Sequence, residues 1–256
     1  MEYAFIRVPA AALRRKPGHP REMVNQLLFG EAVKILRIKN DQWIKVRSLH
    51  DEYEGWLTGS MLIAADKEAA KTKHPIVTTG LLDSLVIGDE KMMIPAGSTL
   101  PFFADGKGKL GELEYFFNGF SRDRYAQEPA AAWIIQMAKT WLHAPYLWGG
   151  RTILGVDCSG FVQVIFKLAG IDLPRDAWQQ AQVGKPVKKL EDALPGDLAF
   201  FDNREDIVHT GILLGNGEII HASGRVRIDD ITSKGIQNRE TGKRTARLRA
   251  IRRVLD

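Results

Sequence analysis

The sequence predicts an α+β protein in which two small β-barrels precede a larger domain of helices followed by antiparallel strands. Short runs of alternating apolar and polar residues, separated by turn residues, fill residues 1–65 and 76–120, as is typical of small barrels. From residue 129 onward, two stretches have helical periodicity and four strand-like runs follow them. Helices followed by antiparallel strands indicate an α+β domain.

The first predicted barrel spans residues 1–65. Residues 32–38 and 43–47 alternate apolar and charged side chains, Asn40 and Asp41 predict the turn between them, and residues 55–57 open a further strand. Residues 66–75 are polar and end in a proline, which predicts a linker. The second predicted barrel spans residues 76–120. Its strands are expected at residues 81–87, 91–94, 99–104 and 111–117.

The last predicted domain spans residues 129–256. A helix is expected over residues 130–142, because apolar side chains recur there at helical spacing and Pro145 follows. A second helical face begins at Cys158 and ends before Gly170. Strands are expected at residues 198–201, 207–214, 218–222 and 247–254.

Composition excludes several classes of protein. The chain has 256 residues, of which 45% are hydrophobic and 26% charged, and no apolar run approaches the roughly 20 residues of a membrane span. The first 30 residues lack an apolar core followed by a small-residue cleavage site. This predicts a cytoplasmic protein, or an extracytoplasmic one if a leader has been trimmed. Its one cysteine can form neither an internal disulfide nor a thiolate metal cluster.

The net charge of +5 is concentrated near the end of the chain. Residues 225–256 hold ten lysines and arginines against four acidic residues. Such a stretch could meet an anionic polymer, although it is more often a solvated face. Because the sequence has no helix-turn-helix, zinc-finger or RNA-binding motif, we expect no nucleic-acid partner.

Cys158 is a candidate nucleophile. It follows Asp157 at the predicted start of a helix, where the partial positive charge of the helix terminus favours a thiolate and can lower the pKa of the thiol. The unpaired N–H groups of that terminus can also stabilise an oxyanion. The alternative is an inert buried thiol, which is the commoner role of a lone cysteine.

His209 and His221 are candidate partners of the thiol, because each lies within an apolar strand of one predicted hairpin. A tight two-residue turn at Asn216 and Gly217 would place the two histidines on opposite faces of the sheet. An odd loop or a bulge would place His221 opposite Gly211, and the imidazoles would then be diagonal neighbours on one face. A triad therefore requires the odd loop or the bulge.

Six motifs from Ala130 to about Val254 resemble the NlpC-type cell-wall peptidases, a papain-like family. In chain order they are PYLWGG, DCSGF, LPRDA, PGDLAFF, VHTGILLG and IIHAS. The resemblance implies a triad in which Cys158 is the nucleophile, His209 is the base and His221 orients His209. The pattern of residues 30–57 is similar to bacterial SH3-like domains, so the expected architecture is two SH3-like barrels before a papain-like domain.

Two SH3-like domains ahead of this peptidase domain look like the γ-D-glutamyl-L-diamino acid endopeptidases. The resemblance implies hydrolysis of murein peptides with a free N-terminal L-alanine, releasing L-Ala-γ-D-Glu. It also implies that Asp176 binds the substrate amine and that Tyr146, Asp157 and Ser159 line the site. An acid of the first barrel, Glu52 or Glu54, would add to amine binding. Asp176 could instead be only a helix N-cap.

We expect a monomer that binds a murein peptide and uses no metal or other cofactor. Two alternatives stay open at this stage. The same residues could serve an amidase or acyltransferase acting on another acyl donor. The chain could also be a non-catalytic cell-wall-binding protein.

Overall fold

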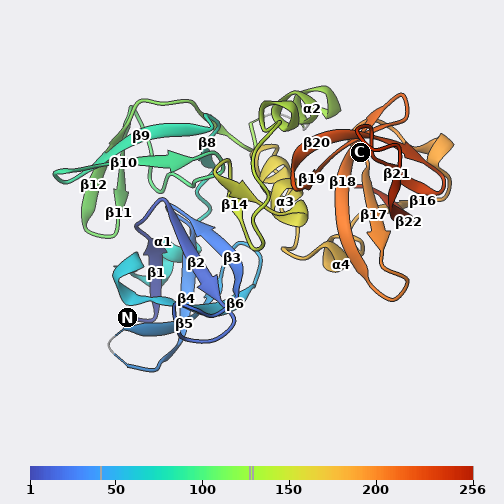
Figure 1. Cartoon of the computed structure of the whole chain (residues 1–256). Coiled ribbons are helices and arrows are strands. Elements are labelled where there is room, and N and C mark those ends of the chain that lie inside the picture. The colour runs from blue at the N-terminus through green and yellow to red at the C-terminus, as the bar shows by residue number, and fades with distance from the viewer. Residues whose placement is uncertain (41, 127, 129, 256) are drawn as a thin grey trace. The chain divides into compact units, whose positions relative to one another are not determined.

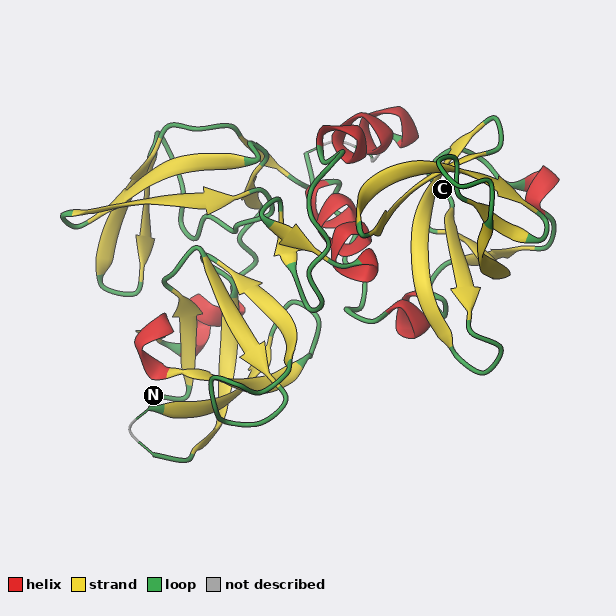
Figure 2. Ribbon diagram, viewed as in Figure 1, coloured by secondary structure: helices red, strands yellow, loops and turns green. Residues whose placement is uncertain are grey.

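The computed structural model describes residues 1–40, 42–126, 128 and 130–255. Asp41, in the predicted turn of the first barrel, and Pro129 and Asp256, at the bounds of the last predicted domain, lie outside the described residues. The chain divides into two compact units (Figure 1). One comprises Met1–Ala126 and Trp148–Ile153, and the other comprises Gln127–Leu147 and Leu154–Asp256. The first is mainly strand with short helical segments, whereas the second has longer helices beside its sheet (Figure 2).

The first part of the first unit is a seven-stranded antiparallel sheet in the order β3-β2-β6-β5-β4-β1-β7. Its alternating residues direct one apolar set, which includes Ile6, Leu27 and Val46, into a common core. The elements are β1 (Tyr3–Ile6), β2 (Ala10–Arg14), β3 (Met23–Leu28), β4 (Ala32–Ile38), β5 (Trp43–Ser48), β6 (Glu54–Thr58), the 3₁₀ turn η1 (Gly59–Met61) and β7 (Leu62–Ala65).

The second part of this unit has a four-stranded sheet in the order β10-β9-β12-β11 and a separate pair, β13-β8. Phe5 and Phe29 of the first part pack with Leu85, Ile94 and other residues of the second, so the two parts share a core. The elements are α1 (Lys67–Lys71), β8 (Ile76–Thr78), β9 (Leu82–Ile87), β10 (Glu90–Pro95), β11 (Lys107–Leu110), β12 (Leu113–Phe117) and β13 (Ser121–Asp123).

The predicted linker of the first unit contains a short helix, and one predicted strand is wrong. The stretch 66–75, expected to be a linker, contains α1, whose first turn is capped by the Asp66 side chain accepting from the Ala69 N–H at 2.7 Å. Residues 99–104, expected to be a strand, form only isolated β-bridges at Thr99 and Ala104 with a turn between them. Their first N–H groups bond to the carbonyls of Phe29 and Ile76 instead, each at 2.9 Å. The backbone there links neighbouring segments and does not extend a sheet.

The second unit contains a seven-stranded antiparallel sheet in the order β16-β22-β17-β18-β19-β20-β21, and a further pairing of β21 with β22 closes six of these strands into a barrel. The elements are α2 (Ala131–Thr140), α3 (Cys158–Leu168), α4 (Ala177–Gln180), β16 (Lys185–Val187), the 3₁₀ turn η2 (Leu190–Asp192), β17 (Leu198–Asp202), β18 (Ile207–Gly215), β19 (Glu218–Ser223), β20 (Arg225–Thr232), β21 (Gly235–Gln237) and β22 (Arg244–Arg253). The short strands β14 (Arg151–Thr152) and β15 (Gly155–Val156) belong to the first and second units respectively.

Alternation along the central strands separates two apolar layers. Ala199, Phe201, Leu213 and Ile219 belong to the core inside the barrel. The apolar residues that alternate with them, Leu198, Phe200, Ile212 and Ile220, point to the opposite face and are also buried. Helix α3 contacts β18 and β19, and all of its residues are buried. The first residue of this helix, Cys158, is thereby held against the sheet.

Candidate active site

The start of α3 is fixed by Asp157. This residue is the N-cap of the helix, and its Oδ1 accepts a hydrogen bond from the Gly160 N–H at 2.7 Å. Cys158 is therefore the first helical residue, as predicted. Its side chain extends from the end of the helix where backbone N–H groups lack helical partners.

The sulfur of Cys158 lies against β18 at His209. The thiol donates to the carbonyl of Val208, the residue before His209, at a distance of 3.9 Å. The backbone of Thr210, the residue after His209, also hydrogen-bonds to the sulfur. The sulfur thus contacts the backbone on both sides of the proposed base, although Cys158 and His209 are far apart in sequence.

The two imidazoles meet on one face of the sheet. Ile212 pairs with Ile220, so the same register places His221 opposite Gly211, and the pairing shifts between Leu213 and Gly215. This shift is the irregularity that a triad was predicted to require. Nε2 of His209 lies 2.8 Å from Nδ1 of His221, so the predicted diagonal pair is confirmed.

Burial disfavours the charged forms of both Cys158 and His209, and so shifts their pKa values. Cys158 is only 5% exposed, and burial, with a smaller contribution from the charge of Asp157, raises the pKa of its thiol to about 12. Burial also lowers the pKa of His209 to about 3, and the nearby His221 adds to that effect. The expectation that the helix terminus lowers the thiol pKa is therefore wrong, because desolvation outweighs the backbone N–H groups. Burial therefore favours the neutral form of both groups.

Arg175 is a site residue that the sequence analysis did not single out, although it lies within the LPRDA motif. Its guanidinium is buried and binds both carboxylate oxygens of Asp157, at 3.0 and 2.5 Å, and the Ser159 hydroxyl at 2.9 Å. Asp157 and Ser159, expected to line the substrate site, are therefore observed in an ion-pair network that flanks the nucleophile on both sides. Their contact with substrate stays a prediction.

Asp176 and Tyr146 also lie in the second unit. Asp176 is the N-cap of α4, and its backbone N–H donates to Oε1 of Gln179 at 3.2 Å, so the N-cap role is observed. Burial, and then the charge of Cys158, raises the pKa of the Tyr146 phenol above its ordinary value. Tyr146 is thus close enough to the nucleophile for their charges to interact. Substrate contacts of these two residues stay predictions.

Glu52 and Glu54 belong to the first unit. The Glu52 carboxylate is 70% exposed and lies 3.8 Å from the guanidinium of Arg47. Glu54 is held more firmly, because Lys45 and Arg47 each donate to it at 2.6 Å. A role for Glu52 in amine binding stays a prediction.

Among the described residues, no group of three or more histidine, cysteine or acidic side chains is arranged to hold a metal ion. Within that same part of the chain, no helix is both long and apolar enough to cross a membrane.

Comparison with known proteins identifies the same family that the sequence motifs resemble. The family model described as the NlpC/P60 family matches residues 143–245, and a bacterial dipeptidyl-peptidase SH3 domain matches residues 13–62. The γ-D-glutamyl-L-lysine dipeptidyl-peptidase of Bacillus subtilis (strain 168) is 33% identical over 214 residues, covering 77% of this chain and 71% of that protein. The chain belongs to the NlpC/P60 family. It is a cysteine peptidase of that family with an N-terminal SH3 domain.

Other NlpC/P60 relatives extend the match over more of the chain. The dipeptidyl-peptidase 6 of Lysinibacillus sphaericus is 25% identical over 244 residues, covering 86% of this chain and 87% of that protein. The crystal structure of an NlpC/P60 family protein from Bacillus cereus ATCC 10987 superposes with a TM-score of 0.85 at 24% identity, covering 99% of this chain and 100% of that one. The fold of an SH3-like region followed by an α+β NlpC/P60 domain is thus shared along the chain.

Proposed function

We propose that the protein hydrolyses the γ-D-glutamyl-L-diamino acid bond of murein peptides that begin with a free L-alanine, and releases L-Ala-γ-D-Glu. The 2.8 Å contact between His209 and His221, beside the sulfur of Cys158, carries the chemical part of this proposal. The substrate part is supported by the names of two relatives, from Bacillus subtilis and Bacillus cereus, each a γ-D-glutamyl-L-lysine dipeptidyl-peptidase.

Acylation begins at the γ-carbonyl of D-glutamate. A bond forms between Sγ of Cys158 and the carbonyl carbon while the thiol proton passes to Nδ1 of His209, the ring nitrogen that His221 leaves unoccupied. Because the resting groups are neutral, proton transfer accompanies attack. Backbone N–H groups at the start of α3 stabilise the oxyanion. His209 then protonates the leaving amine, the C–N bond breaks, and a thioester remains.

Deacylation follows the same route with water in place of the thiol. His209 takes a proton from water, the hydroxide adds to the thioester carbon, and the C–S bond breaks. The sulfur takes back the proton held by His209, and the dipeptide leaves as a γ-carboxylic acid that releases its own proton to solvent. One water is consumed for each amide bond cleaved, and no atom changes its oxidation state, so the reaction as written needs no further reactant.

The nucleophile is tested by the Cys158→Ala variant with L-Ala-γ-D-Glu-L-Lys as substrate. We expect the wild-type protein to release L-Ala-γ-D-Glu and the variant to lose turnover by at least about 10³-fold, as removal of an activated nucleophile does elsewhere. Product is measured by chromatography. Turnover by the purified variant at more than one-tenth of the wild-type rate would remove Cys158 from the mechanism.

Amine recognition is tested in the same assay with the N-acetylated tripeptide and with Asp176→Asn. Acetylation should abolish cleavage, because a desolvated ammonium needs carboxylate partners and the acetyl group removes its charge. Asparagine still caps a helix, so Asp176→Asn should raise KM without unfolding α4. Equal cleavage of both peptides would instead favour an amidase that ignores the amino terminus.

A further inference from the structure

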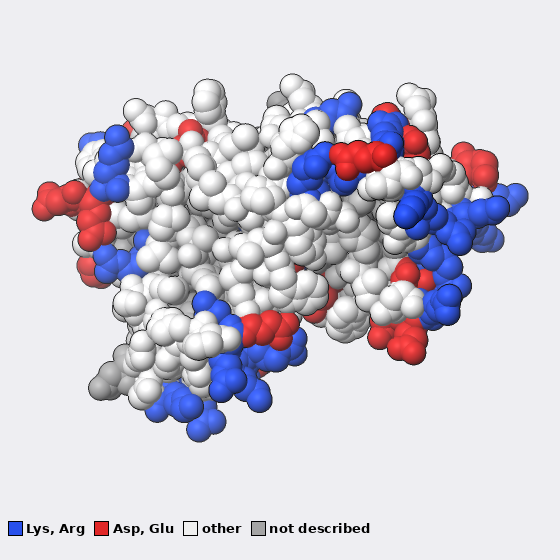
Figure 3. All heavy atoms as spheres, viewed as in Figure 1, with Lys and Arg blue, Asp and Glu red and all other residues white. Residues whose placement is uncertain are grey.

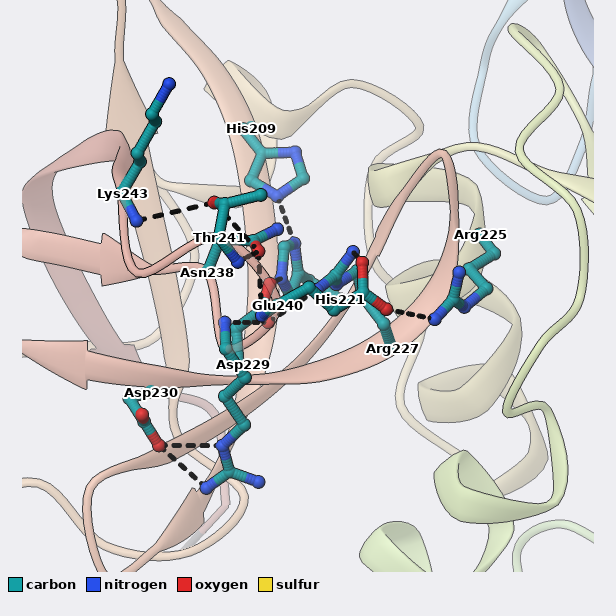
Figure 4. A network of polar contacts seen from close by, with 11 residues as sticks. His209, His221, Arg225, Arg227, Asp229, Asp230, Asn238, Glu240, Thr241 and Lys243 are labelled. Atoms are coloured by element: carbon teal, nitrogen blue, oxygen red, sulfur yellow. Dashed lines mark hydrogen bonds and ion pairs between the residues drawn. The ribbon is translucent and has the colours of Figure 1, made fainter.

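The buried carboxylate of Asp229 hydrogen-bonds to His221, which in turn hydrogen-bonds to His209. Oδ2 of Asp229 lies 3.1 Å from Nε2 of His221, and the two side chains are 1% and 2% exposed. The register of the sheet explains the placement, because His221 pairs with Arg227 and Ile219 pairs with Asp229. Asp229 is therefore a diagonal neighbour of His221, as His221 is of His209. Figure 4 shows the three side chains in sequence across β18, β19 and β20.

Asp229 is held as an anion with its two oxygens assigned to different partners. Oδ1 accepts from Nη2 of Arg227 at 2.9 Å and from the backbone N–H of Arg239 at 3.0 Å. Arg227 is held in turn by Glu240 at 3.0 Å (Figure 4). Burial raises the pKa of Asp229, but the hydrogen bonds from His221, Arg239 and Arg227 outweigh burial and keep it well below its ordinary value. Only Oδ2 faces His221.

These contacts specify where the protons lie. A carboxylate can only accept a hydrogen bond, so Nε2 of His221 carries a proton. In neutral His221, Nδ1 is then an acceptor, and it must receive the proton of His209 Nε2 across their 2.8 Å contact. Neutral His209 has no second ring proton, so its Nδ1 keeps a lone pair. That is the form a general base requires.

We propose that Asp229 is a positioning residue of the catalytic apparatus, which sets the tautomer of His221 and through it the tautomer of His209. It touches neither substrate nor sulfur in this role. The series Asp229–His221–His209 has the logic of the carboxylate in Ser-His-Asp triads, with one additional imidazole between the carboxylate and the base.

Asp229→Asn tests the proposal because the surroundings dictate how the amide lies. Arg227 and the Arg239 N–H both donate to the Oδ1 position, so the amide oxygen must occupy it. The NH₂ group then faces Nε2 of His221 and reverses both tautomers, leaving Nδ1 of His209 protonated. In Ser-His-Asp triads, the corresponding change lowers kcat by about 10⁴-fold. Here we expect a loss of at least about 10² in kcat, with KM nearly unchanged.

Asp229→Ala separates this role from a structural one. Alanine removes the acceptor of the hydrogen bonds from Arg227 and from the Arg239 N–H and leaves a cavity, so it should lower the melting temperature more than asparagine does. It imposes no tautomer, however, and should retain more activity than asparagine. If the alanine variant is less stable but more active than the asparagine variant, the result supports the proposal. Asparagine at least as active as alanine would overturn it.

A matched control lies next along β20. Asp230 is paired with Arg239 at 2.7 Å and its side chain is 48% exposed. Figure 4 shows it directed away from the imidazoles. Asp230→Asn should keep the wild-type kcat and pH profile. A loss in Asp230→Asn as large as that in Asp229→Asn would mean that any charge change on this strand is damaging, and would overturn the proposal.

The kinetic measurements on the Asp229 variants rest on the proposed function, because they need its substrate. An NMR measurement of the histidine tautomers needs no substrate. ¹⁵N-histidine NMR of Cys158→Ala should show Nε2–H tautomers for His209 and His221, and Cys158→Ala/Asp229→Asn should show Nδ1–H tautomers for both. Nδ1–H in the single variant would overturn the proposal. If the wild-type protein fails to cleave the tripeptide while the NMR result holds, the substrate assignment fails and the tautomer assignment stands.

Discussion

Cys158 lies between two opposing influences. Asp157 and Arg175 form a buried ion pair next to it, with side chains only 8% and 1% exposed, so the carboxylate that would repel a thiolate is largely compensated. Desolvation of the sulfur is not compensated to the same extent and raises its pKa to about 12. Burial thus favours the thiol over the thiolate in the resting protein.

The pH dependence of alkylation follows from that raised pKa. Thiolate is the species that iodoacetamide attacks, so below the thiol pKa its population rises about tenfold for each pH unit. We expect the alkylation rate of native Cys158 to rise about 10³-fold between pH 6 and pH 9, without a plateau. Mass spectrometry of the modified protein measures the rate.

The control is the same chain unfolded in urea, in which the thiol has an ordinary pKa near ~8.5 and the rate begins to level off around that pH. Burial slows access at every pH but does not change the slope. A rate for the native protein that is already constant from pH 6 upward would show a preformed thiolate–imidazolium pair, and would reject the neutral resting state.

The irregular pairing of β18 and β19 places His221 on the same face of the sheet as His209. Its shifted pairing places His221 opposite Gly211, where a Cβ atom would lie 2.8 Å from Cβ of His221 and 2.9 Å from the carbonyl oxygen of Ile220. Real Cβ atoms essentially never approach so closely. Glycine at this position therefore allows the imidazole of His221 to lie over the strand.

Gly211→Ala is expected to displace β19 or rotate His221, because the three close neighbours of the new Cβ, in Ile219, Ile220 and His221, all belong to β19 and only the end of the Ile219 side chain can move by itself. The free energy of unfolding should fall by about 1–3 kcal/mol, as overpacking typically costs. Peptidase activity should fall as well, because the His209–His221 contact depends on this placement. Urea denaturation and tripeptide turnover measure the two effects.

Gly224→Ala is the matched control, since a Cβ there meets nothing within 4 Å although its φ is +70°. Its cost should be limited to the left-handed backbone, about 1–2 kcal/mol, with activity retained. If Gly211→Ala keeps full activity, the close approach does not position His221.

The basic character of residues 225–256 is largely neutralised in the folded molecule. Its arginines pair with acidic side chains from several strands, and on the face drawn in Figure 3 positive and negative side chains lie among one another. The pairs are Arg225 and Arg227 with Glu240, Arg239 with Glu218 and Asp230, Arg247 with Asp202, and Arg253 with Asp197. The solvated-face interpretation of this stretch fits these pairs better than a site for an anionic polymer.

The first unit is completed by a segment from far along the chain. Arg151, on β14, donates to both carboxylate oxygens of Glu31, at 3.0 and 2.9 Å, and the two side chains are 0% and 1% exposed. Arg151 also donates to the carbonyl of Gln26 at 2.9 Å. Residues 148–153 are thereby held to the first unit, although the segments on either side belong to the second.

Glu31→Gln should destabilise the first unit strongly, because a buried guanidinium would lose its counter-charge. Breaking such a pair from one side costs about 3–5 kcal/mol, measured as the free energy of urea unfolding. The control is Glu90→Gln, which removes an exposed partner of Arg7 at 3.8 Å and should cost at most about 1 kcal/mol. Equal, small losses in both variants would show that the buried pair does not hold the segment.

Much of the fold and the site can be predicted from neighbouring residues. The helix that begins at Cys158 and the strands that carry His209 and His221 follow from apolar periodicity, capping and the alternation of side chains. The same alternation shows that a triad needs a bulge between the two strands, but it does not decide whether the bulge is there. These properties depend on residues a few positions apart, so they can be read along the chain. Strand β20, from Arg225 to Thr232, also alternates apolar and charged residues, so it could have been predicted in the same way.

Other features were decided only when distant segments packed together. The burial that raises the thiol pKa, the pairing of Arg175 with Asp157, and the alignment of Asp229 behind His221 each require partners supplied by another element. The Glu31–Arg151 pair joins residues 120 positions apart. Desolvation and ion pairing depend on what surrounds a group in space, and no local pattern records that. The candidate reacting residues could therefore be named from the sequence, whereas the burial that shifts their pKa values comes from the tertiary structure.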